Sequence, residues 1–115
     1  MSIVCTESAK YHQMDAALGD TVTMPCNSTP YSGVMWVQNR TDGHYGHIYS
    51  NFSIRNNQSR FSVVNASAGD YSLKISNVHL ADSGLYDCYE ASGSRIIGYD
   101  LVVEGTFIDV LKTTF

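Results

Sequence analysis

The side chains with the most distinctive chemistry in this sequence are three thiols, at Cys5, Cys26 and Cys88. Two thiols can form a disulfide bond, and an odd count leaves one cysteine to be explained. Cys5 has four interpretations: a free buried thiol, an interchain bridge, the partner of a cysteine beyond residue 115, or the remnant of a leader. All four remain open from the sequence.

The histidines do not indicate a metal site. His44 and His47 are three residues apart in a turn-like segment, with no cysteine or carboxylate at ligand spacing, and His12 and His79 have no partners in the sequence. No Ser, Cys or Asp stands in a catalytic arrangement with a histidine, and there is no Gly-rich phosphate loop. We therefore expect no enzymatic activity, metal or cofactor.

Length and composition indicate one compact domain. The chain has 115 residues, of which 43% are hydrophobic and 16% charged, which is typical of a folded protein. Seven basic and 11 acidic residues give a net charge of −4, so we expect neither nucleic acid nor an anionic membrane as a partner. No apolar stretch is long enough to span a bilayer. Membrane attachment would require segments absent from this chain.

Short runs of alternating polar and apolar residues predict strands. Turn residues such as Gly, Asp and Asn separate these runs, and helical periodicity is nearly absent. Strand-sized runs at short spacing predict an antiparallel sandwich or barrel. The runs cover residues 21–26, 34–38, 60–64, 71–75 and 85–89.

Three of these runs carry a recognisable set of residues. Trp36 follows Cys26 by ten positions, and Tyr86 precedes Cys88 by two, within the sequence Asp-Ser-Gly-Leu-Tyr-Asp-Cys. This set resembles the immunoglobulin domain and is most similar to its variable, or V-set, type. The 23 residues between Trp36 and Arg60 leave room for strands C′ and C″, which is typical of V-type domains.

The resemblance covers residues 2–111, with residues 112–115 as a tail toward a stalk or a further domain. It implies an all-β, two-sheet, antiparallel Greek-key sandwich. It also implies a disulfide between Cys26 and Cys88 that bridges the two sheets, with Trp36 packed on it.

Two further contacts follow from the same resemblance. The hydroxyl group of Tyr86 would bond back to the main chain near Asp82, as a tyrosine corner. Arg60 and Asp82 would form an ion pair that closes one end of the sandwich. These residues are expected to hold the domain together and do not indicate what it binds.

A disulfide implies an oxidising compartment, so we expect an extracellular location. Asn-x-Ser/Thr triplets agree with that location, because they are acceptors for N-linked glycans on exposed loops. The sequence has five, at Asn27, Asn39, Asn51, Asn57 and Asn65. Glycans there would leave the side of strands F and G as the more open surface.

Alternation also predicts a partner-binding face. With Trp36, Tyr86 and Cys88 pointing inward, the outer face of strands C, C′, F and G would carry Met35, Val37 and Tyr89, with Ile48 or Tyr49 beside them. An exposed apolar and aromatic patch on a solvated sheet face favours an interface, and members of the V-set family pair through this face. The alternative is a set of scattered exposed apolar residues.

The last strand has two possible registers. In the first, residues 96–104 form strand G, with Tyr99, Leu101 and Val103 pointing inward. In the second, which we favour, residues 105–110 form strand G. Residues 91–100 then become a projecting loop that would anchor a partner through Arg95, Ile96, Ile97 and Tyr99.

The sequence thus predicts an extracellular recognition or adhesion module of an immune-type cell-surface receptor. It would bind a protein counter-receptor, or form a homodimer, through the C–C′–F–G face and the F–G loop. Two alternatives stay open. One is a secreted V-type protein that binds carbohydrate or another small ligand through its loops, and the other is a purely structural domain.

Overall fold

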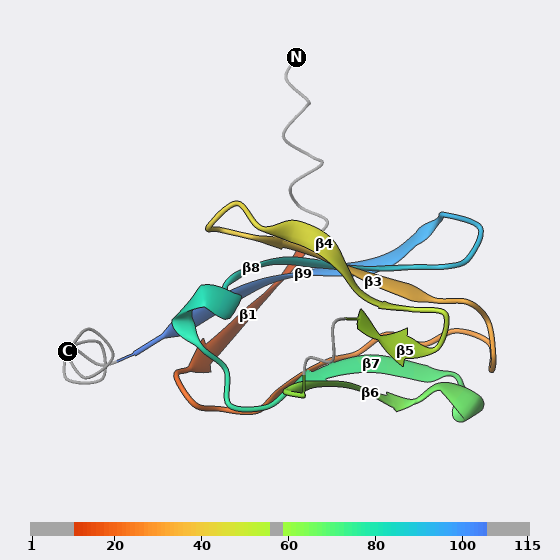
Figure 1. Cartoon of the computed structure of the whole chain (residues 1–115), viewed down its shortest axis with the longest axis horizontal. Coiled ribbons are helices and arrows are strands. Elements are labelled where there is room, and N and C mark those ends of the chain that lie inside the picture. Colours follow the sequence, from red (N-terminus) through yellow and green to blue (C-terminus); the bar gives the residue numbers. More distant parts are fainter. Residues whose placement is uncertain (1–10, 56–58, 106–115) are drawn as a thin grey trace, which may run out of the picture.

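The computed structural model describes residues 11–55 and 59–105, and these form two packed sheets (Figure 1). The larger sheet has the order β1 (Tyr11–Ala17), β9 (Arg95–Glu104), β8 (Gly84–Tyr89), β3 (Met35–Arg40), β4 (Tyr45–Ser50) and β5 (Ser53–Ile54). The smaller sheet has the order β2 (Val22–Met24), β7 (Asp70–Ile75) and β6 (Phe61–Asn65). Two short 3-10 helices, η3 (Ala66–Ala68) and η4 (Leu80–Asp82), complete this part of the chain.

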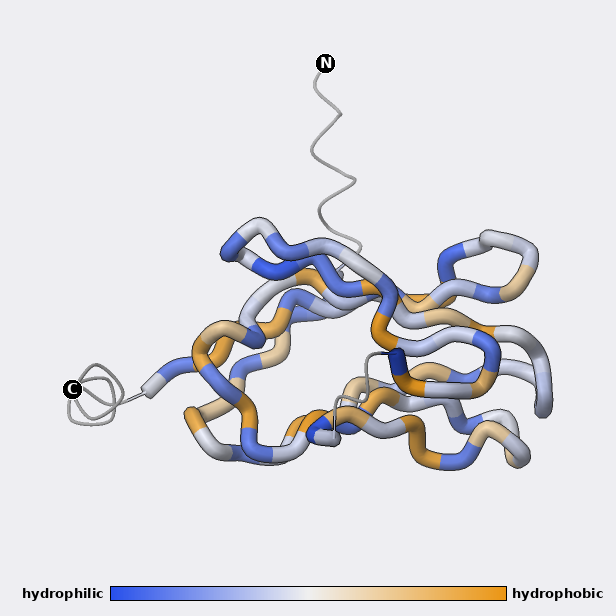
Figure 2. Tube along the Cα trace, in the orientation of Figure 1, coloured by the Kyte–Doolittle hydropathy of each residue, from blue (hydrophilic) through white to orange (hydrophobic). Residues whose placement is uncertain are grey.

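The core lies between the two sheets and is made by alternate residues of their strands. Trp36, Tyr71, Leu73, Tyr86 and Leu101 are all fully buried there. Hydrophilic residues lie outside this core, as Figure 2 shows for the turn between β3 and β4. The indole of Trp36 donates a hydrogen bond to the carbonyl oxygen of Tyr71 (2.7 Å), so the one polar group of this ring is satisfied inside the core.

The framework contacts are present as predicted. Cys26 and Cys88 form a disulfide with their Cα atoms 6.7 Å apart, and it connects the chain after β2 to β8 in the other sheet. The hydroxyl group of Tyr86 donates to the carbonyl oxygen of Asp82. Arg60 donates twice to the Asp82 carboxylate, at 2.7 and 3.0 Å.

Strand pairing is antiparallel throughout the described residues except at one edge. There β1 runs parallel to β9, with Tyr11 opposite Gly98 and Ala17 opposite Glu104. β1 is not among the strands predicted from the sequence. Its placement covers an edge of the larger sheet that would otherwise expose unpaired backbone groups.

The favoured register of the last strand is wrong. β9 follows β8 after a tight turn, in which the backbone N–H of Glu90 donates to Ser94 (2.8 Å). Tyr99, Leu101 and Val103 point into the core and are buried, as the other register predicted. Residues 91–100 therefore do not form a projecting loop, and residues 106–110 lie outside the described part of the chain.

Candidate functional site

The outer face of the larger sheet is defined by its register. Residues opposite one another across β4, β3, β8, β9 and β1 share a face. One such row joins Met35, Tyr89 and Arg95, and a second joins His47, Val37, Asp87, Gly98 and Tyr11. A third joins Tyr45, Asn39, Leu85, Asp100 and Gln13. We call these three rows the outer face.

Four residues predicted for the partner-binding face are buried. Ile48 and Tyr49 both belong to the core, because a bulge between Trp36 and Val37 shifts the pairing of β3 with β4. Tyr99 is 4% exposed, and its hydroxyl donates to the carbonyl oxygen of Pro25. Val37 does point to the outer face but is only 6% exposed, flanked by His47 and Asp87 on the neighbouring strands.

The remaining predicted residues divide into two groups. Ile96 and Ile97 pack against the core from β9 and are partly buried. Met35, Tyr89 and Arg95 are partly exposed on the outer face.

Two tyrosines of this face, Tyr45 and Tyr11, are not among the residues predicted from the sequence. Tyr45 is the more prominent, at 67% exposed. Its position two residues before His47 was the available signal, since alternation on β4 places both side chains outward. Tyr11 was missed because β1 was not predicted.

A polar network occupies the centre of the outer face. The Asp87 carboxylate accepts hydrogen bonds from Arg95 Nε (2.6 Å) and from the Tyr11 hydroxyl (3.0 Å). The Arg95 guanidinium also lies over the Tyr11 ring, 4.5 Å from its centre. Burial, the hydrogen bond to Asp87 and the charge of Asp87 raise the pKa of Tyr11, so this hydroxyl stays protonated and remains a donor.

Gly98 makes room for this network. A Cβ atom at this position would lie 2.7 Å from Asp87 Oδ1 and would overlap the Arg95 guanidinium. The absence of a side chain therefore allows the Arg95 side chain to cross β9 and reach Asp87.

We expect Gly98→Ala to break the contact between Arg95 and Asp87 while preserving the fold. The clashing atoms are ends of side chains that can move, so the free energy of unfolding should fall by about 1 kcal/mol. The measurements are urea denaturation and the NMR signal of the Arg95 Nε–H. Gly46→Ala is the matched control, because a Cβ there meets nothing within 4 Å. An unchanged Arg95 signal in Gly98→Ala would contradict the role of Gly98.

Four of the five predicted glycan acceptors lie in the described part of the chain, and all four are exposed: Asn27, Asn39, Asn51 and Asn65. Asn39 belongs to the outer face, opposite Tyr45 and Leu85. Asn57 lies outside the described residues. Exposure is necessary for glycosylation but does not by itself show that a glycan is attached. The assignment of these residues as glycan acceptors therefore stays a prediction.

Within residues 11–55 and 59–105 no cluster of three potential metal ligands occurs. The same residues contain no helix of the length and hydropathy needed to cross a bilayer.

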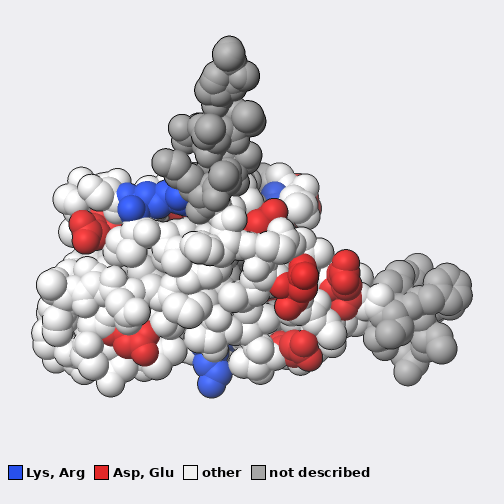
Figure 3. Space-filling model, turned by 180° about the vertical axis from the view of Figure 1, so that it is seen from behind, with Lys and Arg blue, Asp and Glu red and all other residues white. Residues whose placement is uncertain are grey.

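On the face seen in Figure 3, acidic side chains gather toward the end at which β9 finishes.

Comparison with known proteins gives a family and a set of structural neighbours. Residues 10–104 match the model of the immunoglobulin V-set domain. No protein of curated function shows significant similarity in sequence. The first Ig domain of the mouse polymeric immunoglobulin receptor is 18% identical, with a TM-score of 0.67, and the match covers 84% of this chain and 92% of that chain.

Two other solved structures are similar. Tim-2 is 22% identical, with a TM-score of 0.65 and coverage of 83% of this chain and 93% of that chain. A structure of Dpr1 IG1 bound to DIP-eta IG1 is 19% identical, with a TM-score of 0.67 and coverage of 82% and 90%. At these identities the structures show a shared fold. Together with the family match over most of its length, they show that this chain belongs to the immunoglobulin V-set family.

Proposed function

We propose that this chain is an extracellular recognition module of a cell-surface receptor or adhesion molecule. It binds a protein partner, or a second copy of itself, through the outer face of its larger sheet. The observation that carries the proposal is the gathering of Tyr11, Tyr45 and Tyr89 with Met35 and Arg95 on that one face. Tyrosine, methionine and arginine are enriched in protein interfaces, and tyrosine and arginine are frequent hot spots.

The arrangement of these side chains suits reversible binding. The rings of Tyr45 and Tyr89 offer apolar area with a hydroxyl donor, at a small cost in conformational entropy. The contacts of Asp87 with Tyr11 and Arg95 fix the centre of the face before a partner arrives, which lowers the cost of ordering it on binding.

Two further observations support this function. The disulfide between Cys26 and Cys88 favours a protein that folds in an oxidising compartment. Two of the similar solved structures are complexes between Ig domains, one of Dpr1 IG1 with DIP-eta IG1 and the other a ZIG-8–RIG-5 IG1–IG1 heterodimer. A V-type domain, including a second copy of this chain, is therefore the first class of partner to test.

The test is a surface plasmon resonance screen of the chain against itself and a panel of purified V-set domains. We expect at least one specific interaction. The double substitution Tyr45→Ala with Tyr89→Ala should weaken it by roughly a hundredfold or more, because each ring contributes as a hot spot. A charged substitution at Val37 is unsuitable for this test. Val37 is only 6% exposed, so a charge there would also destabilise the fold.

The matched control is Val64→Ala, which removes an apolar side chain that is 50% exposed on β6, in the other sheet. This variant should bind like the wild type. The proposal fails if no panel member or second copy binds. It also fails if binding survives the double substitution but is lost in Val64→Ala.

A further inference from the structure

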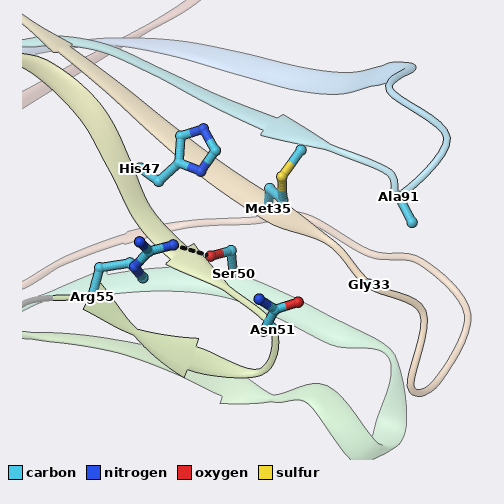
Figure 4. A pocket seen from close by; sticks show the side chains of 7 residues that line it. All are labelled: Gly33, Met35, His47, Ser50, Asn51, Arg55 and Ala91. Carbon is cyan, nitrogen blue, oxygen red and sulfur yellow. Dashed lines mark hydrogen bonds between the residues drawn. The ribbon is translucent and has the colours of Figure 1, made fainter.

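A hollow of about 380 Å³ opens at one end of the outer face. Figure 4 shows its lining, which brings Met35 on β3 together with His47 and Ser50 on β4, Asn51 in the following turn, and Ala91 after β8. Arg55, just after β5, closes one side. A volume of this size holds a small side chain or a single sugar.

Arg55, the cation of this hollow, has no carboxylate beside it among the described residues. The arginines at 40, 60 and 95 each form an ion pair with an aspartate, at 2.6–2.7 Å. Arg55 forms no such pair with any described residue, and no acidic side chain lines the hollow. An unneutralised guanidinium in a concave site attracts an anion.

The Arg55 side chain is already oriented. Its Nη1 donates to Ser50 Oγ (2.8 Å), and this bond fixes one arm of the planar group. The described residues accept no hydrogen bond from Nε or Nη2, so N–H groups on both of these atoms remain for a bidentate contact with a carboxylate.

The other lining residues complete the fit. Asn51 and His47 also line the hollow, and the amide of the first and the imidazole of the second each carry an N–H donor. The Met35 thioether and the Ala91 methyl group provide apolar surface for the carbon skeleton that carries the carboxylate. The set has donors at one side and apolar surface at the other.

We infer that this hollow binds a carboxylate group, held by Arg55. The group belongs either to a glutamate or aspartate side chain of a protein partner or to a free sugar acid. The first source extends the proposed function, because Met35 and His47 also belong to the outer face. The inference is nonetheless tested without any partner, so its failure and the failure of the proposed function are distinguishable.

The test is an NMR titration of the full chain with its disulfide formed. A glycan on Asn51 would attach to the amide nitrogen that lines the hollow, so the protein must be unglycosylated. The probes are acetyl-Gly-Glu-Gly-amide and glucuronate, and their uncharged counterparts are acetyl-Gly-Gln-Gly-amide and glucose. We expect saturable shifts at Asn51, Arg55 and Ala91 with the carboxylates only, weakening as salt is raised.

Two variants assign the effect to Arg55. Arg55→Gln should weaken carboxylate binding by about tenfold or more, because a charged, bidentate contact is lost. Arg40→Gln is the matched control: it removes the same charge from a partly exposed arginine paired with Asp42, and it should leave binding unchanged.

The two carboxylate probes distinguish the two sources of the carboxylate. Tighter binding of the glutamate peptide supports a partner's side chain as the source, and tighter binding of glucuronate supports a sugar acid. The inference is overturned if neither carboxylate gives saturable shifts. It is equally overturned if the uncharged probes bind as well, or if Arg40→Gln weakens binding as much as Arg55→Gln.

Discussion

Replacing Cys26 and Cys88 together with alanine is expected to lower the free energy of unfolding by about 4 kcal/mol. The disulfide joins residues 62 positions apart, and breaking it lets the unfolded chain regain the entropy of that loop. Both half-cystines are buried, at 2% and 0% exposed, so their packing is lost as well. Urea denaturation measures the change through the fluorescence of Trp36, which pairs with Cys88 across β3 and β8.

The comparison is made in a Cys5→Ala background, because Cys5 would be the one cysteine left in the double variant and could bridge two copies of the chain. The Cys5→Ala protein with both other cysteines intact is the reference, and any contribution of residue 5 cancels. A loss of less than about 1 kcal/mol would contradict the expectation, because removal of a native disulfide from a small domain costs several times more.

The framework could be predicted from the sequence because each of its contacts is fixed by residue type and spacing. Trp36 and Cys88 are direct neighbours in the register of β3 and β8, and Tyr86 reaches back only four residues to Asp82. The ion pair of Arg60 with Asp82 spans 22 residues, but it depends on charge types that the V-set resemblance already assigns. Such contacts do not change when loops or bulges shift elsewhere.

The outer face was harder to predict, because exposure depends on neighbouring strands. Strict alternation places Ile48 and Tyr49 on opposite faces, yet the bulge beside Val37 brings both into the core. A bulge depends on how two strands pair, and the sequence of one strand does not reveal it. Val37 is a similar case. Its side chain points to the outer face, as predicted, but it is buried, and this was not predicted.

The last strand was mispredicted because two stretches of sequence alternate equally well. The apolar positions of residues 99–103 and of residues 106–110 both fit an inward face, so periodicity cannot distinguish them. Pairing distinguishes them, because the short turn from Glu90 to Ser94 lets β9 pair with β8 directly. The turn residues Ser92, Gly93 and Ser94 were visible in the sequence, and giving them more weight would have selected the right register.

The second large effect on stability is expected from the ion pair between Arg60 and Asp82, at one end of the sandwich. The Asp82 side chain is 2% exposed and that of Arg60 is 27% exposed, and Asp82 Oδ2 also accepts from the backbone N–H of His79 (2.7 Å). Arg60→Ala would leave a buried carboxylate without its countercharge, which should lower the free energy of unfolding by about 3 kcal/mol or more. Arg40→Ala is the control, since its partner Asp42 stays exposed to water and the loss should be much smaller.

The same contact predicts how stability changes with pH. Burial alone would raise the pKa of Asp82, but the hydrogen bonds from Arg60 and His79 outweigh it and hold the pKa below its ordinary value of 3.8. The ionised Asp82 therefore stabilises the fold fully above that value, and its contribution is lost as the pH falls through the lowered pKa of the folded state. Asp82→Asn has no carboxylate to titrate, so its deficit in unfolding free energy relative to the wild type should be large at neutral pH and should shrink in acid. Urea denaturation of both proteins across this pH range measures the deficit, and a deficit that stays constant into acid would show that the charge of Asp82 does not stabilise the fold.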